Sequence, residues 1–221
     1  MEKGKLIVVE GACDGVGKTT QVELLKEYLE QYGEVITHHF PTYHEVSGFL
    51  VEKYLAKEFG ELKELNPYFI NSLYAIDRAI VCKDKIMPAL NEGKTVLLDR
   101  YTTSSVIYQA ATLPIENDVK KDFIEYVMDF EYNRLGIVKP DAVIFLTAPY
   151  EVIKQIRNAR KVNDGILKDI HESNEEYLMD VYNTAQYASK ILGWDRVECS
   201  NGDQMRPIEE IHESIKKILE R

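Results

Sequence analysis

The stretch Glu10-Gly11-Ala12-Cys13-Asp14-Gly15-Val16-Gly17-Lys18-Thr19-Thr20 directly follows the apolar run Leu6-Ile7-Val8-Val9. A strand that turns into a helix through small residues can direct several backbone N–H groups at phosphate oxygens. The helix start adds about half a positive charge. In this arrangement Lys18 reaches the outer phosphates of a nucleoside triphosphate, and the Thr19 hydroxyl ligates Mg²⁺. The stretch therefore predicts a phosphate-binding loop, made by Asp14, Gly15, Val16, Gly17, Lys18, Thr19 and Thr20.

The start of this loop departs from the usual spacing. Four residues normally separate its first glycine from Gly17, and Ala12 holds that position here. Gly11 lies one step further out, so either Ala12 substitutes for glycine or the loop carries one extra residue. A chance G-K-T sequence is the alternative explanation, but the strand before it and the helix after it favour phosphate binding.

The composition indicates one soluble domain over residues 1–221. A chain of this length can bury about 70% of its unfolded surface around one core, and no linker or repeat divides it. The net charge of −10, from 37 acidic and 27 basic residues, argues against binding to a nucleic-acid polymer. No apolar run approaches the ~20 residues of a membrane span. Three widely spread cysteines without metal or disulfide spacing fit a cytoplasmic protein.

Short apolar runs alternate with longer segments of helical periodicity, which is typical of a parallel sheet covered by helices on both faces. Helices are expected over 18–32, over 67–91 with Asn66 as N-cap, and after Pro207; Pro88 should bend the second of them. The sequence therefore predicts a three-layer α/β fold with a five-stranded parallel sheet. The expected strands are 5–10, 35–40, 95–99, 142–146 and 196–199.

Polar side chains follow the carboxyl ends of these strands, where parallel sheets bind ligands. Asp99 ends the third strand and Arg100 follows it. In phosphate-loop proteins an acid at this point lies opposite the lysine and holds Mg²⁺. Asp99 alone is equally explained as a turn cap, but a guanidinium next to it suits a substrate phosphate. The pair therefore favours a functional role.

Two further groups of residues have both a functional and a structural explanation. Tyr74 and Arg78 lie four residues apart on one side of a helix, where they can stack on a base and read its edge; a core tyrosine and a surface ion pair are the commoner explanation. Residues 157–170 can form a short lid that brings cations onto a transferring phosphoryl group. A basic helix end followed by an exposed loop is the alternative. The lid cations would be Arg157, Arg160, Lys161 and Lys168.

Together these motifs resemble the thymidylate kinase family along nearly the whole chain. The first loop of that family reads E-G-x-D-G-x-G-K-T-T, with one residue more than usual in this chain. The family also has F-P after the second strand, an aromatic residue four before an arginine, D-R-Y, and S-x-x-x-Y-Q. In this sequence these are Phe40-Pro41, Tyr74 with Arg78, Asp99-Arg100-Tyr101, and Ser104 with Tyr108 and Gln109.

The resemblance implies transfer of the γ-phosphoryl group of Mg-ATP to dTMP, giving dTDP and ADP. It implies a phosphate-loop nucleoside monophosphate kinase fold and, because family members usually form homodimers, a homodimer. The implied dTMP-binding residues are Asp14 at the sugar 3′-hydroxyl, Tyr74 on thymine, Arg78 and Gln109 at the thymine edge, Tyr101 at the deoxyribose, Arg100 at the monophosphate, and Phe40 and Ser104 from the shared motifs. Arg157 against adenine and Asn201 beside it complete the ATP site, and Thr19 and Asp99 hold Mg²⁺.

Three departures from the family pattern affect catalysis. Thr42-Tyr43 stands where many relatives carry an arginine that contacts the substrate phosphate. Residues 169–172 correspond to a frequent D-R-x-E pattern of the lid but lack its arginine. The phosphate loop also contains no arginine. A cation at the transferring phosphoryl group must then come from Arg160, Lys161 or Lys168. We expect Arg160, so that the predicted catalytic residues are Lys18, Asp99, Arg100 and Arg160.

Two alternatives stay open at this stage. One is another nucleoside monophosphate kinase or a deoxynucleoside kinase, in which Asp99 would act as a base toward a sugar hydroxyl. The other is a non-catalytic ATP-binding regulator. A GTPase switch is disfavoured, because Asp99-Arg100-Tyr101-Thr102 lacks the Asp-x-x-Gly that such switches need.

Overall fold

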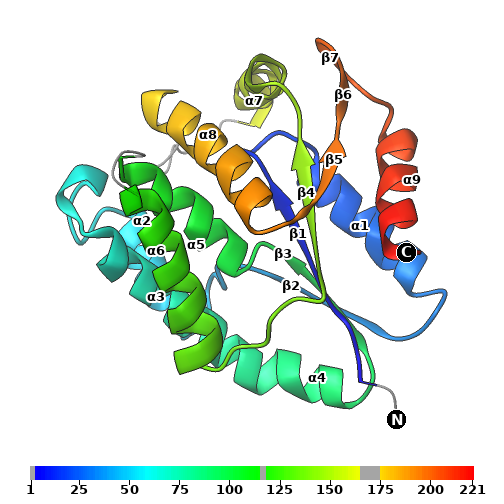
Figure 1. The fold of residues 1–221 in the computed structure, drawn as a ribbon, viewed down its shortest axis with the longest axis horizontal. Helices are drawn as coiled ribbons and strands as arrows, with labels where there is room; N and C mark the ends of the chain where they lie inside the picture. Colours follow the sequence, from blue (N-terminus) through cyan, green and yellow to red (C-terminus); the bar gives the residue numbers. More distant parts are fainter. Residues whose placement is uncertain (1–2, 115–117, 165–174) are drawn as a thin grey trace.

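Five strands form one parallel sheet in the order β2-β3-β1-β4-β5 (Figure 1). The computed structural model describes residues 3–114, 118–164 and 175–221. The predicted five-stranded parallel sheet is confirmed, and every strand bound lies within one residue of the expected one. The strands are β1 (Leu6–Gly11), β2 (Val35–His39), β3 (Thr95–Asp99), β4 (Ala142–Thr147) and β5 (Asp195–Glu198).

Helices cover both faces of the sheet, which confirms the expected three layers (Figure 1). On one face α1 (Lys18–Leu29) packs beside α9 (Ile208–Leu219). On the other lie α3 (Pro67–Val81), α4 (Met87–Asn91), α5 (Thr102–Tyr108), α6 (Val119–Met128) and α8 (Glu175–Ile191). The remaining α-helices are α2 (Phe49–Leu55), which packs on α3, and α7 (Tyr150–Asp164).

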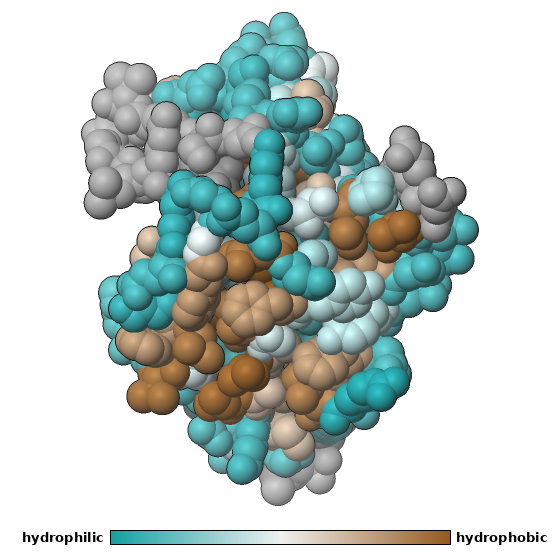
Figure 2. Space-filling view, turned by 90° about the vertical axis from the view of Figure 1, so that its left-hand side faces the viewer, coloured by the Kyte–Doolittle hydropathy of each residue, from teal (hydrophilic) through white to brown (hydrophobic). Residues whose placement is uncertain are grey.

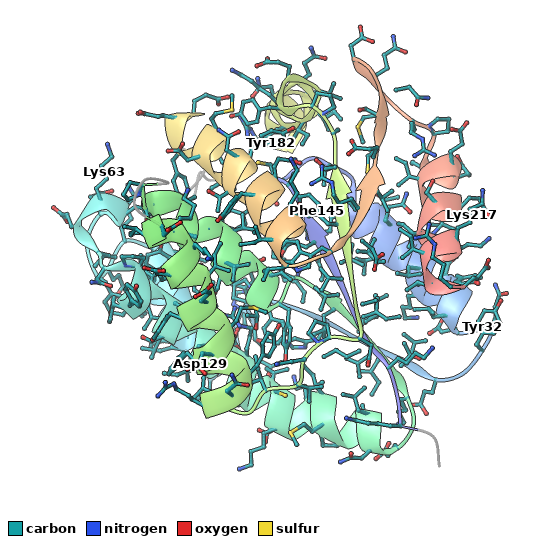
Figure 3. All side chains as sticks on the ribbon, in the orientation of Figure 1. Tyr32, Lys63, Asp129, Phe145, Tyr182 and Lys217 are labelled. Atoms are coloured by element: carbon teal, nitrogen blue, oxygen red, sulfur yellow. The ribbon has the colours of Figure 1, made fainter. Side chains whose placement is uncertain are left out.

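The alternation of side chains along the strands explains why both faces need cover. Ile7 belongs to a buried cluster with Leu25 of α1, whereas its neighbour Leu6 belongs to a cluster with Leu90 of α4. Phe145 of β4 is fully buried and lies in the interior of the molecule (Figure 3). Because its strands are apolar on both sides, the sheet forms the middle layer between two layers of helices.

The helix expected over 67–91 is present, but its turns are not uniform. Asn66 Oδ1 accepts a hydrogen bond from the Tyr68 N–H at 2.8 Å, which confirms the predicted N-cap. A π-helical turn, η2 (Cys82–Ile86), separates α3 from α4. It ends at Ile86, two residues before Pro88, whose ring would clash with the preceding turn of a regular α-helix.

Several local features were not predicted. A second π-helical segment, η5 (Asp129–Arg134), continues α6, and β6 (Ser200–Asn201) pairs with β7 (Gln204–Met205) as an antiparallel hairpin. Two 3₁₀ turns are η1 (Leu62–Glu64) and η3 (Ala110–Thr112). The first helix ends at Leu29 rather than at position 32. Within the ranges described, no helix has the length and apolar character needed to span a membrane.

Candidate active site

A cavity at the carboxyl end of the sheet brings the predicted substrate-binding residues together. β1 and β3 are neighbouring parallel strands, so the loops that follow them meet at one edge. Residues of α3 and α5 close the cavity from the side. All eight predicted dTMP-binding residues line it, namely Asp14, Phe40, Tyr74, Arg78, Arg100, Tyr101, Ser104 and Gln109. His39, Tyr43, Ser105 and Tyr108 line the same cavity without having been assigned a role from the sequence.

The geometry of the phosphate loop supports the longer of the two loop interpretations. A Cβ atom on Gly11 would lie 2.7 Å from Val16 Cγ1, so Gly11 is the position that excludes a side chain. Ala12 is buried and its N–H donates to the Leu146 carbonyl at 3.0 Å. The loop therefore holds five residues between Gly11 and Gly17.

Lys18 at the start of α1 forms a buried ion pair with Asp99 at the end of β3. His39 Nδ1 donates to the second oxygen of Asp99 at 2.9 Å. Burial acts to raise the pKa of Asp99, but the hydrogen bond from His39 and the charge of Lys18 outweigh it, so this pKa lies well below its usual range. Burial lowers the pKa of Lys18. Asp99 is thus an ionised carboxylate, held by Lys18 on one oxygen and by His39 on the other.

Arg100 reaches across the cavity mouth to the phosphate loop. Its backbone has φ +68°, a left-handed conformation that is uncommon for arginine. The guanidinium pairs with Asp14 and lies 3.4 Å from Ser104 Oγ. Glu10, which is fully buried, stands 3.7 Å from the guanidinium and accepts from Ser104 Oγ at 2.6 Å. Glu10 had been identified only as a motif residue, and the structure places it behind Arg100 as a second carboxylate.

Arg78 forms a buried, two-bond ion pair with Glu131 of η5. Arg78 Nε and Nη2 donate to the two carboxylate oxygens, each at 2.6 Å. The expected alternative, a pair with a surface acid, is wrong because Arg78 is 1% exposed and Glu131 0% exposed. Tyr74, one turn earlier on α3, lines the cavity and packs edge-on against Tyr54 with ring centres 6.1 Å apart.

Apart from Asp14, the described residues predicted for the ATP side do not line this cavity. Arg157 is buried, with Nη2 2.9 Å from Glu175 Oε2, and its backbone lies against Gly15 of the phosphate loop. Asn201 is exposed on β6. The side chains of Arg160 and Lys161, and the whole of Lys168 and 169–172, lie outside the described residues.

Comparison with known proteins agrees with this geometry. The family model for thymidylate kinase matches residues 9–215. The chain belongs to the thymidylate kinase family. It is 32% identical over 221 residues to the thymidylate kinase of Caldicellulosiruptor saccharolyticus, covering 99% of this chain and 97% of that relative. It is 38% identical over 193 residues to that of a Thermoanaerobacter species, covering 80% and 88%.

The solved structure of thymidylate kinase from Candida albicans has the same fold. It superposes with a TM-score of 0.72 at 22% identity and covers 99% of this chain and 92% of its own. This likeness extends to the full set of layers described above. The thymidylate kinase family thus accounts both for the fold and for the motifs that meet at the carboxyl edge.

The oxygen donors beside the phosphate loop fit the metal expected for a member of the thymidylate kinase family. Thr19 is exposed in the first turn of α1, and Asp99 offers one carboxylate. The part of the chain that the structure describes contains no cluster of three or more His, Cys, Asp or Glu side chains able to hold a metal. One carboxylate and one hydroxyl suit Mg²⁺, which retains waters and takes its other ligands from substrate phosphates.

Proposed function

We propose that the protein transfers the γ-phosphoryl group of ATP to dTMP, forming dTDP and ADP. The observation that carries this proposal is the single cavity that Tyr74, Arg78 and Arg100 line together. Arg100 lies beside the ion pair of Lys18 and Asp99 at the phosphate loop. A nucleotide with its base at Arg78 therefore directs its phosphate toward the phosphates that the loop binds.

Transfer needs positioning and positive charge rather than a strong base. An oxygen of the dTMP phosphate attacks the γ-phosphorus, and the bond from that phosphorus to the bridging oxygen of ADP breaks. The attacking oxygen is already anionic at neutral pH, so no proton has to be removed. Lys18 and Arg100 each exchange a carboxylate partner for phosphate oxygens. We propose Arg160 as the further cation at the transferring group.

We propose Mg²⁺ as the metal, held by the Thr19 hydroxyl and by Asp99. When bound, it neutralises charge on the ATP phosphates. The change Asp99→Asn removes a full negative charge from this ligand set. We expect a large loss of kcat together with a shift of the magnesium titration to higher concentration. Asp195→Asn, on the edge strand β5 and three strands away from β3, is the matched control. An unchanged titration in Asp99→Asn would contradict the role.

A comparison of acceptors tests the proposed function directly. Initial rates with dTMP, dUMP, UMP, CMP and thymidine at fixed Mg-ATP should give the highest kcat/KM for dTMP. Thymidine should not be phosphorylated, because its neutral hydroxyl would need a base. Transfer to thymidine would support the nucleoside kinase alternative, and ATP consumption that no acceptor stimulates would support the regulator alternative.

The change Arg160→Ala tests the proposed cation. We expect kcat to fall by roughly 10³-fold or more, as for loss of an arginine finger, with little change in KM for dTMP. Lys154→Ala is the control, because Lys154 lies on the same helix and pairs with Glu175 at 3.0 Å. Near-normal turnover of Arg160→Ala would rule the assignment out.

We propose further that the protein is a cytoplasmic homodimer that acts on small nucleotides without a nucleic-acid polymer or a membrane. An apolar area occupies the face that carries α2 and α3 (Figure 2). On these helices Phe49 of α2 is 53% exposed, and Phe69 and Ile76 of α3 are 43% and 45% exposed. Burial of such an area against a second copy removes apolar surface from water.

Light scattering after gel filtration tests the dimer. Ile76→Lys should convert the dimer to monomers, because it buries an unpaired charge in the contact. Ile208→Lys adds the same charge on α9, where Ile208 is 48% exposed, and should leave the mass unchanged. A monomeric wild-type chain would contradict the proposal.

A further inference from the structure

Glu131 lies behind the wall of the substrate cavity, where it fixes the guanidinium of Arg78. It accepts from Arg78 Nε and from Nη2, each at 2.6 Å, and its Oε2 also accepts from Thr102 Oγ1 at 2.8 Å. Both members of the ion pair are at most 1% exposed, so water does not compete for these bonds. Two parallel hydrogen bonds leave the guanidinium plane a single orientation.

The remaining donors of Arg78 can be counted. A guanidinium has five N–H groups; Glu131 takes two, and Ser105 Oγ accepts a third from Nη2 at 2.6 Å. The last two are on Nη1, whose contact with the Tyr101 carbonyl oxygen is long, at 3.5 Å. Because Arg78 lines the cavity, Nη1 is the nitrogen left to meet a bound molecule.

Glu131 lies in the π-helical segment η5. A π turn is wider than an α turn, and two consecutive residues of η5, Glu131 and Tyr132, are both buried. Glu131 reaches Arg78, while Tyr132 packs in the cluster that contains Leu6 of β1. The carboxylate is thus held by packing of its neighbour as well as by Thr102.

We propose that Glu131 is a positioning residue for nucleobase selection, which holds Arg78 so that Nη1 presents a fixed donor to the base. The inference rests on the proposed function and adds a positioning residue to it. The base must carry a carbonyl oxygen at the edge that meets Arg78, as thymine and uracil do. An amino group at that edge, as in cytosine, would place donor against donor and leave both without an acceptor.

Arg78 offers the base N–H donors and no acceptor, as every guanidinium does. Burial acts to lower the pKa of Arg78, but the charge and hydrogen bonds of Glu131 outweigh it and raise this pKa above its usual value. The guanidinium has no acceptor to offer an amino group. A neutral side chain at position 131 would keep the shape of the site but weaken the charge-assisted bonds that fix the orientation of Arg78.

The variant Glu131→Gln tests the proposal, with kcat/KM measured for dTMP and for dCMP. We expect the dTMP to dCMP ratio to narrow by at least about tenfold, mainly through a higher KM for dTMP, with KM for ATP unchanged. Asp129→Asn is the matched control, since Asp129 lies in the same π-helical segment, is 44% exposed and pairs with Arg134. Asp129→Asn should change neither the dTMP to dCMP ratio of kcat/KM nor the KM for dTMP.

A purely structural role would lower the melting temperature without moving the dTMP to dCMP ratio, and that outcome would overturn the inference. If Glu131→Gln does not fold, Thr102→Val decides, because it removes the 2.8 Å hydrogen bond to Glu131 and leaves the ion pair. We expect the ratio to narrow by about two- to fivefold in that variant. An unchanged ratio in a folded Thr102→Val would then overturn the inference.

A double variant shows whether Glu131 acts through Arg78. In the Arg78→Met background, Glu131→Gln should cost no further dTMP specificity, because the donor that it positions is gone. If Glu131→Gln lowers the dTMP specificity of Arg78→Met as much as it lowers that of the wild type, the inference is contradicted. Wild-type protein that phosphorylates another monophosphate but not dTMP would instead defeat the proposed function, and the two failures are therefore distinguishable.

Discussion

The two arginines of the cavity are paired in opposite ways. At the nucleobase end, Arg78 and Glu131 are both buried and joined by two hydrogen bonds of 2.6 Å. At the phosphate end, Arg100 pairs with Asp14, whose side chain is 54% exposed. A buried partner cannot be replaced by a ligand, whereas an exposed one can move into water. Under the proposed function, we therefore expect Arg78 to keep its orientation while it contacts the base, and Arg100 to exchange its carboxylate partner for the substrate phosphate.

The largest expected difference between the two ion pairs is in their contribution to the free energy of unfolding. Glu131→Leu leaves the charge of Arg78 buried and unpaired, so we expect the free energy of unfolding to fall by about 3–5 kcal/mol. Asp14→Asn removes an exposed partner and should cost about 0–1 kcal/mol. Urea unfolding at pH 7 gives both values, and equal losses would show that the two pairs do not differ in kind.

Ligand binding sharpens the comparison further. Arg100→Ala should lower kcat/KM for dTMP by roughly 10²–10³-fold, because it removes charge from the phosphate end. The affinity for thymidine, which has no phosphate, should change little in that variant but should fall in Arg78→Met. Calorimetry with thymidine checks this, and an equal loss of thymidine affinity in both variants would contradict the division of roles.

A smaller effect is expected from pH at the phosphate end. The folded-state pKa of Asp99 is depressed below its ordinary value of 3.8, so its pairing contributes stability that is present above that value. This contribution, roughly 2 kcal/mol, is lost progressively as the pH falls from about 4 toward the folded-state pKa. Asp99→Asn should therefore lose less stability than wild type between pH 5 and pH 2.5 in urea titrations. A parallel loss in both proteins would show that Asp99 does not contribute.

The smallest expected effect concerns the three cysteine thiols, which should be unreactive in the folded protein. Burial raises the pKa of Cys13, in the phosphate loop, and of Cys199 to about 12 in each case. Cys82, beneath the nucleobase end, is also buried with a raised pKa. Native protein at pH 8 should therefore react slowly with a thiol reagent, and all three thiols should appear on unfolding. A fast thiol that ATP protects would identify Cys13 as accessible.

The sequence predicted those site residues that the parallel sheet or a single helix brings together. Asp99 and Arg100 follow a strand adjacent to β1, so the parallel sheet alone brings them to the phosphate loop. Tyr74 and Arg78 share a helix face because of their spacing, and both line the cavity. The helical spacing and the resemblance of the motifs carried these assignments, whereas the order of the strands was not predicted.

The sequence missed the partners that depend on packing between distant elements. Glu131 lies 53 positions after Arg78, on a π-helical segment that no local pattern signals. His39 was not assigned, because its contact with Asp99 requires the register of β2 against β3. Glu10 was visible in the motif, but its place behind Arg100 follows only from the three-dimensional fold. The Lys and Arg side chains of the proposed lid stay predictions.

The widened turn of η5 has a consequence for comparisons between relatives. Shortening the chain by one residue between 129 and 131 would rotate the following positions by about 100° around the helix axis, and the carboxylate would leave its arginine. A homologue that is one residue shorter in this region must orient the corresponding arginine by other means. Segment length, more than residue identity, is then the trait that should track discrimination between carbonyl and amino pyrimidines.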